Sequence, residues 1–399
     1  MMKRLFIGLA FAITIGITTS NPTFADEMYS HDLMIEQQKV IAQVDRIEKQ
    51  AGASGTSAGV GGLDERVRRI EEALQETSLL GKWAERITLS GAIEVEVGYE
   101  KIDFADPALD DEDASDLVLA TAELGVDVAI ARHVGGHVLF YWEEDESDGV
   151  DLDEGFIILD GGDILPLYLN VGRLYVPFGN FESHFISDPL TLEIGEAGES
   201  AVLVGTGNDW TEIRLSIHNG DVDEIGDDDH IGGFSAGAAF TLPEGVVPDI
   251  GLSAGASYTS NIADSDGLEG ETPGEIEDHV GGLGTFLSVS FQDRFFLEAE
   301  YVTALDHFKP GELSFDGGDE RKPMAWNLEL AVAPMDDLEV AVRYEGSDDT
   351  GDFLPEAQFG GVVSYGLFEN TSLALEYLRG EFENDDERDV LTAQFAVEF

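Results

Sequence analysis

The feature that most constrains this chain is an alternation of apolar and polar residues that begins at Ile87 and recurs to the last residue. In the first such segment Ile93 and Val97 share an apolar face, and Glu94 and Glu96 share the opposite face. Successive side chains of a β-strand point to opposite faces, so the pattern predicts strands with one apolar and one wet face. A soluble sandwich and a membrane barrel both satisfy this pattern.

The same alternation returns in later segments, whose polar faces carry single acidic residues. In the second segment the pattern assigns Val118 and Leu124 to the apolar face and Thr121 to the polar face. We count about sixteen segments, between about 14 and 18, separated alternately by short turns and long acidic loops, as in outer-membrane barrels. Clear examples are residues 118–130, 295–301, 326–332, 338–345 and 373–377.

The end of the chain favours the membrane barrel. Leu391, Phe395 and Phe399 alternate up to a terminal phenylalanine, which is typical of the last strand that the bacterial barrel-assembly machinery recognises. Closure of the sheet leaves no strand edge exposed to lipid. We therefore expect an all-β transmembrane barrel of antiparallel strands over residues 83–399, with the assembly machinery, through Phe399, and outer-membrane lipid as partners.

The N-terminal residues resemble a secretory signal. Lys3 and Arg4 precede an apolar run of about fifteen residues, and a small-x-small site ends at Ala25, so residues 1–25 are expected to be a signal peptide. A retained anchor is the alternative. No later apolar run approaches the roughly twenty residues that a membrane-spanning helix needs.

Residues 26–82 have helical periodicity. Leu33, Val40 and Val44 lie at heptad-like spacing, and a Gly/Ser/Ala-rich stretch at 51–62 separates them from a second short run. This pattern predicts a short periplasmic α-helical coiled coil with a flexible linker. A parallel coiled coil would suit a homotrimer, and a marginal helix packed on the barrel is the alternative.

The composition excludes several classes of function. The net charge of -61, from 82 acidic and 21 basic residues, repels phosphates and excludes nucleic-acid binding. There is no cysteine, so neither disulfides nor thiolate chemistry is available. No cofactor is expected, although the acidic loops could bind Ca²⁺ weakly. A salt-adapted source organism would give the same acidic bias.

The sequence motifs that could indicate an enzyme lack the structural context that catalysis requires. Two segments, 233–237 and 251–255, match G-x-S-x-G, but a nucleophile elbow needs a strand, a sharp turn and a helix. Here both serines, Ser235 and Ser253, lie within strand alternation. His133 and His137 are four residues apart on a turn-rich stretch, so we expect neither a metal site nor catalysis.

One segment differs from the other loops. After Pro177 comes a loop that is rich in phenylalanine and less acidic than the rest. A loop folded into the lumen and packed against the wall would have this composition, and an ordinary packed surface loop is the alternative. The candidate constriction residues are Arg173, Glu182, His184 and Asp188.

Charged residues on the polar strand faces are the candidates for lumen charge. An acidic lumen would favour cations. The candidates are Glu94, Glu96, Glu123, Asp127, Arg214, Glu298, Glu300, Glu329 and Arg343.

With the signal peptide, the coiled coil, the segment GRLYVPFGNFESHFISDPLT at 172–191 and the terminal Phe399, the chain resembles the LbtU family of siderophore porins. Its most specific part is residues 172–196. The resemblance implies an outer-membrane porin for ferric siderophore that works without TonB. A barrel of about sixteen strands leaves no room for the plug domain of a TonB-dependent transporter. Ferric hydroxycarboxylate siderophores are anionic, however, and a lumen this acidic disfavours them.

We therefore expect a porin of the bacterial outer membrane that lets small solutes or ferric siderophore through an acidic lumen. The alternative is a structural barrel that tethers the membrane to the periplasm or the peptidoglycan through its coiled coil.

Overall fold

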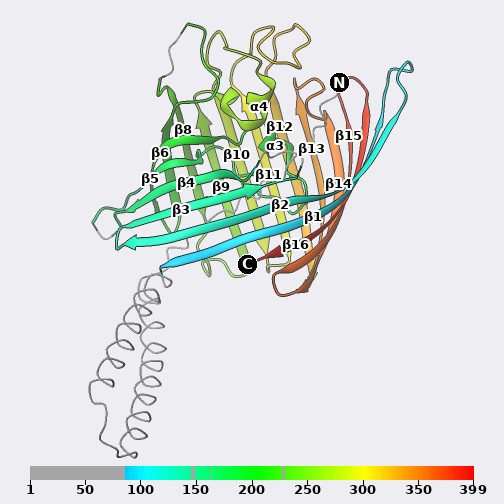
Figure 1. The fold of residues 1–399 in the computed structure, drawn as a ribbon. Coiled ribbons are helices and arrows are strands. Elements are labelled where there is room, and N and C mark those ends of the chain that lie inside the picture. Colours follow the sequence, from blue (N-terminus) through cyan, green and yellow to red (C-terminus); the bar gives the residue numbers. More distant parts are fainter. Residues whose placement is uncertain (1–85, 145–148, 163, 227–229) are drawn as a thin grey trace, which may run out of the picture. The chain divides into compact units, whose positions relative to one another are not determined.

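A computed structural model of the chain describes residues 86–144, 149–162, 164–226 and 230–399. In this part of the chain sixteen antiparallel strands form a closed barrel, in which consecutive strands pair and β1 closes against β16 (Figure 1). The prediction of about sixteen strands is confirmed. The expected signal peptide (1–25) and coiled coil (26–82) lie outside the described residues.

The strands vary in length, and three short helices lie in two of the long loops. Within the described ranges, no helix is long and apolar enough to cross a membrane. The strands are β1 (Ile87–Asp103), β2 (Glu112–Ala131), β3 (Val134–Trp142), β4 (Asp151–Asp160), β5 (Tyr168–Tyr175), β6 (Gly198–Asn208), β7 (Thr211–His218), β8 (Gly233–Thr241), β9 (Ile250–Thr259), β10 (Gly282–Phe291), β11 (Phe295–Ala304), β12 (Met324–Met335), β13 (Leu338–Asp348), β14 (Ala357–Phe368), β15 (Thr371–Glu381) and β16 (Glu387–Glu398). The helices are α3 (Leu190–Glu193), η1 (Ile262–Asp264) and α4 (Asp266–Glu271).

The alternation of residue types places apolar side chains outside the barrel and polar side chains inside it. On β12, Leu328 and Leu330 are 40% and 51% exposed, whereas Asn327 and Glu329 between them are 3% and 0% exposed. The outer surface therefore suits lipid, and the inner surface carries the charged groups.

One expected face is wrong. Glu94 pairs with Thr121, but Val95 pairs with Leu119, so Ala120 is an extra residue in β2. Such a β-bulge reverses the alternation beyond it. Val118 consequently lies opposite Glu96 on the polar face, and not on the apolar face with Leu124.

Aromatic side chains form bands near both ends of the apolar surface. On β11, Phe295 and Tyr301 are both exposed and lie six residues apart, a separation of about 20 Å along a strand. On β14, Tyr365 and Phe359 repeat this spacing. Aromatic residues at these two levels match the interfaces on either side of an apolar band of about 25 Å.

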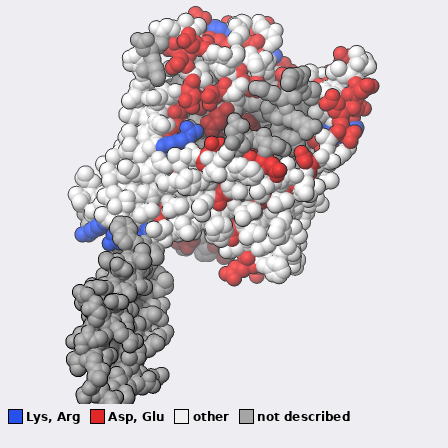
Figure 2. All heavy atoms as spheres, in the orientation of Figure 1, with Lys and Arg blue, Asp and Glu red and all other residues white. Residues whose placement is uncertain are grey.

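The two ends of the barrel differ. Short turns join β2 to β3, β6 to β7 and β12 to β13, whereas the connections after β5, β7, β9 and β11 are long. Figure 2 shows Asp and Glu gathered over the long loops, while much of the barrel wall on this face is neither acidic nor basic. On this face of the molecule, most of the negative charge lies toward the long-loop end.

The largest hydrophobic core is built by the loops, inside the barrel. Leu190 and Ile194 of the β5–β6 loop pack with Ile262 and Leu268 of the β9–β10 loop and with Phe308 of the β11–β12 loop. All five side chains are at most 1% exposed. The long loops are thus packed into the barrel and onto one another, and their positions are fixed by burial of apolar surface.

The two G-x-S-x-G matches lie within paired strands. Ser235 is in β8 and its hydroxyl donates to Oγ1 of Thr259 at 2.9 Å, while Ser253 is in β9. Neither serine stands at the turn between a strand and a helix, which a nucleophile elbow requires.

Candidate channel constriction

The loop between β5 and β6, residues 176–197, crosses the lumen. It leaves the wall after Tyr175 and includes α3, which packs against β11, β12 and β13. In the ring of sixteen strands, β13 lies eight positions from β5 and therefore opposite it. We call residues 176–197 the crossing loop.

Glutamates on the inner wall hold the crossing loop through its backbone. Glu300 of β11 accepts hydrogen bonds from the backbone N–H groups of Asn180 (2.7 Å) and Phe181 (2.9 Å). Glu376 of β15 accepts from the N–H of Ile186 at 2.6 Å. Two further bonds of this kind join the amides of His184 and Leu190 to Glu329 (2.8 Å) and Glu345 (2.9 Å). These charge-assisted bonds satisfy loop amides that have no ladder partner.

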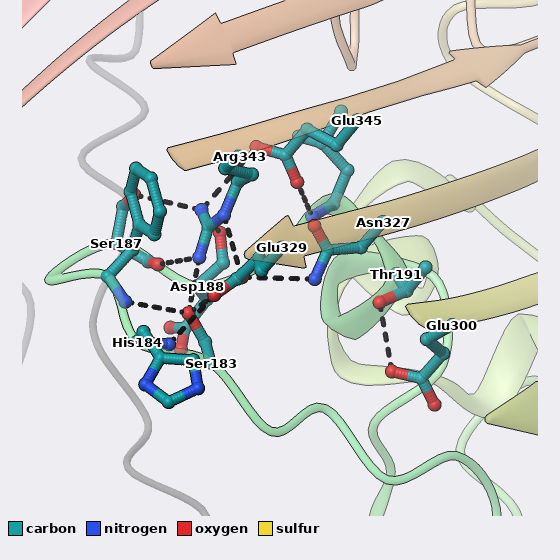
Figure 3. Close-up of polar contacts among 12 residues, drawn as sticks. Ser183, His184, Ser187, Asp188, Thr191, Glu300, Asn327, Glu329, Arg343 and Glu345 are labelled. Carbon is teal, nitrogen blue, oxygen red and sulfur yellow. Dashed lines mark hydrogen bonds and ion pairs between the residues drawn. The ribbon is translucent and has the colours of Figure 1, made fainter. Parts of the chain in front are cut away.

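The side chain of Arg343 on β13 also binds the crossing loop (Figure 3). Its Nε donates to Glu329 at 2.9 Å, and its Nη1 lies 3.4 Å from Oε1 of Glu345. The guanidinium also donates to the backbone carbonyls of Ser187 (2.8 Å) and Asp188 (3.1 Å). The side chains of Arg343, Glu329 and Glu345 are all 0% exposed. Because water cannot solvate these charges, the arginine and the glutamates must lie close together to compensate one another.

Aromatic packing completes the fixation. Phe178, Phe181 and Phe185 are all buried, and the ring of Phe185 lies 4.2 Å from the Arg343 guanidinium carbon. The backbone of Phe181 has a φ of +54°, and its ring lies against Gly179, where a Cβ would come within 2.0 Å of it. Only glycine leaves room for this ring.

The predicted constriction residues do not all share one place. Glu182 and His184 lie on the crossing loop, where Glu182 accepts from Ser288 Oγ of β10 at 3.1 Å. Nδ1 of His184 lies 2.9 Å from Oε1 of Glu339. Asp188 contributes its backbone carbonyl to Arg343. Arg173 lies on β5, before the loop begins, and donates to the carbonyl of Asp153 on β4.

Two titratable groups of the crossing loop, outside the membrane-crossing strands, have shifted pKa values. Burial lowers the pKa of His184, but the hydrogen bond to Glu339 and the charges of Glu339, Glu329 and Glu298 outweigh it and raise the pKa overall. Burial, reinforced by nearby Asp188 and Asp266, raises the pKa of Glu196 well above its usual range. The carboxylates of the barrel wall thus favour the protonated, positively charged form of His184.

The lumen-charge candidates divide into two groups. Glu300, Glu329 and Arg343 bind the crossing loop, as described above. The others contact neighbours on the wall: Glu96 accepts from Gln394 at 2.9 Å, and Glu298 accepts from Ser288. Asp127 lies 2.8 Å from Nδ1 of His137, Arg214 lies 3.8 Å from Glu212, and Glu94 and Glu123 lie on the inner faces of β1 and β2.

Sequence reasoning did not select two of the residues that bind the crossing loop. Glu345 and Glu376 hold the loop backbone, but they lie in strands whose polar faces carry many other acids. Their one local signal is that each occupies a polar position between apolar residues. That signal does not distinguish a loop-binding carboxylate from one exposed to water.

No family model matches the chain. Among curated proteins, a UPF0422 protein of Legionella pneumophila (strain Philadelphia 1) is 25% identical over 290 residues, 66% of this chain and 54% of that protein. A UPF0422 protein of Coxiella burnetii is 28% identical over 274 residues, 64% of this chain and 57% of that protein. The chain therefore spans little more than half the length of these curated relatives.

Solved structures of outer-membrane porins share the fold. An anion-selective porin from Comamonas acidovorans has a TM-score of 0.54 at 14% identity and covers 78% of this chain and 99% of its own. The outer-membrane channel DcaP of Acinetobacter baumannii has a TM-score of 0.51 at 15% identity, with coverages of 78% and 97%. At these identities the likeness establishes the barrel architecture.

Proposed function

We propose that this protein is an outer-membrane porin whose pore is narrowed by the crossing loop. The observation that carries the proposal is the fixation of that loop across the lumen by Arg343 and the wall glutamates. A loop that served only to cover the surface would not need buried charged groups on the opposite wall. In the proposal, solutes pass between this fixed loop and the part of the wall that it leaves uncovered.

We further propose that the path favours cations. Arg343 is offset by Glu329 and Glu345, so it presents little net positive charge to a solute. Glu182 is exposed and shares Ser288 with Glu298, and Glu339 lies nearby at His184. Fixed carboxylates beside a narrow path raise the local concentration of cations and exclude anions.

The narrower proposal, that the solute is a ferric siderophore, rests on the resemblance of residues 172–196. None of the relatives and channels named above is described as a siderophore transporter. Electrostatics favours neutral or cationic ferric complexes over anionic ones in such a lumen. Adding neutral and anionic ferric siderophores in turn to an open channel, and recording block, distinguishes the two cases.

The test is single-channel conductance of the folded protein in a planar bilayer under a salt gradient. We expect discrete openings and a reversal potential of the sign that cation selectivity gives. Protein shown to be folded that carries no current would overturn the porin proposal. An open but anion-selective channel would leave the pore and remove the assigned role of the carboxylates.

A further inference from the structure

Three ionisable side chains from separate segments meet at the long-loop end of β6 and β7. Glu199 is the second residue of β6, His218 is the last residue of β7, and Asp264 ends the short helix η1. One potential ligand atom from each lies within 4.8 Å of those of the other two. The side chains are 3%, 1% and 3% exposed.

In the described part of the chain, two members of this cluster have buried polar atoms without hydrogen-bond partners. Among the described residues, neither ring nitrogen of His218 has a hydrogen-bond partner, and Oε1 of Glu199 has none. The other charged groups that act most strongly on Glu199 are Asp221, Asp264 and Asp266, all of them acidic. Two buried carboxylates beside an unpaired imidazole are costly unless a cation or other donor lies between them.

The surrounding structure holds the three groups in place. Oδ1 of Asp264 accepts from Nδ2 of Asn261 (2.9 Å) and from the backbone N–H of Val222 (3.1 Å), which orients the carboxylate. Gly233 lies opposite His218 in the β7–β8 ladder, and a Cβ there would come within 2.6 Å of Nε2. The imidazole therefore occupies space that only glycine leaves open.

We propose that Glu199, His218 and Asp264 form a binding site for one divalent transition-metal ion, with Zn²⁺ the best match. One imidazole nitrogen and two carboxylate oxygens are a donor set that suits Zn²⁺, Mn²⁺ or Fe²⁺, whereas Ca²⁺ and Mg²⁺ prefer oxygen ligands alone. Ligand atoms about 2.1 Å from a tetrahedral ion lie about 3.4 Å apart. Because the three atoms lie within 4.8 Å of one another, each pair needs to close by at most about 1.4 Å.

A metal at this site would be structural. It would join the β9–β10 loop to the ends of two strands, and that loop in turn contacts the crossing loop. The backbone N–H of Asp266 donates to the carbonyl of Glu196 at 2.8 Å, and Oδ1 of Asp266 accepts from the N–H of Gly198 at 3.2 Å. Three protein ligands leave one position for water. Metal binding at these three residues does not depend on whether the barrel conducts ions.

The test uses the full-length protein, folded in detergent and stripped of metal with EDTA. Titration with ZnCl₂ by calorimetry should show one equivalent bound per chain, and we expect Glu199→Gln and His218→Gln each to weaken binding by at least about tenfold. The matched control is His137→Gln, because His137 is also buried beside two carboxylates, Asp127 at 2.8 Å and Glu154 at 3.4 Å. This control should bind Zn²⁺ as the wild type does.

A second measurement needs no variant. X-ray absorption of the Zn²⁺-loaded wild type should show an imidazole nitrogen bound to the metal, and the bound metal should raise the unfolding temperature. Oxygen ligands alone would overturn the proposal, because they would place Zn²⁺ on surface carboxylates. Equal binding by wild type and His218→Gln, or no binding by folded wild type, would also overturn it, and would leave buried water or a shared proton to satisfy the cluster.

Discussion

Nε of Arg343 on β13 lies 2.9 Å from Oε1 of Glu329 on β12, and neither side chain is exposed to solvent. The same guanidinium donates to the backbone carbonyl of Ser187 on the crossing loop at 2.8 Å. The ion pair therefore joins two wall strands and a loop that begins on the other side of the barrel. A buried pair of this kind depends on both partners, since either one alone would be an uncompensated charge.

Replacing Arg343 by Met should destabilise the protein by about 3 kcal/mol, because Glu329 and Glu345 would remain buried without their cation. Urea unfolding of the detergent-folded barrel, followed by tryptophan fluorescence, measures this change. The matched control is Arg294→Met, whose partner Asp336 is 89% exposed, so its effect should stay below about 1 kcal/mol. Equal effects of the two variants would mean that the buried pair does not stabilise the loop.

Gly179→Ala should loosen the crossing loop, because a Cβ would lie 2.0 Å from the Phe181 ring and φ is +75° there. We expect a loss of about 2 to 3 kcal/mol in unfolding free energy, from the overlap and the backbone strain together, and noisier single-channel currents. Gly311→Ala separates the two causes, since Gly311 has a φ of +93° but no atom within 4 Å of the place that a Cβ would occupy. If Gly311→Ala costs as much, strain alone explains the effect.

The fold could be predicted from the sequence because the alternation of apolar and polar residues is a local property of each strand. Every strand must present apolar groups to lipid, so each segment of about ten residues carries its own signal. The predicted face of Val118 was wrong because the extra residue, Ala120, reverses the alternation beyond it. Nothing in the local sequence marks this bulge. Strand number was therefore predictable, and the register around one irregularity was not.

The candidate constriction could be predicted only in part, because its contacts join residues far apart in the sequence. The phenylalanine-rich composition after Pro177 singled out the crossing loop, with Glu182 and His184 in it. Two acceptors of its amides, Glu345 and Glu376, lie more than 150 residues further along the chain than the amides they bind. Which wall carboxylate meets which amide depends on how the loop crosses the lumen, and no short spacing in the sequence records that.

The contribution of His184 to stability should depend on pH. Its pKa in the folded protein is raised above the ordinary imidazole value of about 6.5 by Glu339 and neighbouring carboxylates, against the effect of burial. The ion pair therefore stabilises fully below about pH 6.5 and is lost as the pH rises through the folded-state pKa.

Unfolding free energies of wild type and His184→Gln, measured from about pH 5.5 to 9, should thus differ most at the acidic end and converge at the basic end. His307→Gln is the control, because its side chain is 52% exposed beside an exposed Asp306. A difference between wild type and His184→Gln that is the same at every pH would exclude this ion pair as its cause.

The carboxylates that set ion selectivity should be those beside the path and not those that bind loop amides. Glu182 and Glu298 both accept from Ser288, and neither is bonded to the crossing-loop backbone in the described structure. The double variant Glu182→Gln/Glu298→Gln removes two negative charges there, so the cation-to-anion permeability ratio should fall by at least about twofold. Reversal potentials under a salt gradient give this ratio directly.

Asp209→Asn, in the exposed turn between β6 and β7, should leave the permeability ratio unchanged because water and salt screen a charge at that turn. An unchanged ratio in the double variant would place the selectivity with the acidic loops at the channel mouth.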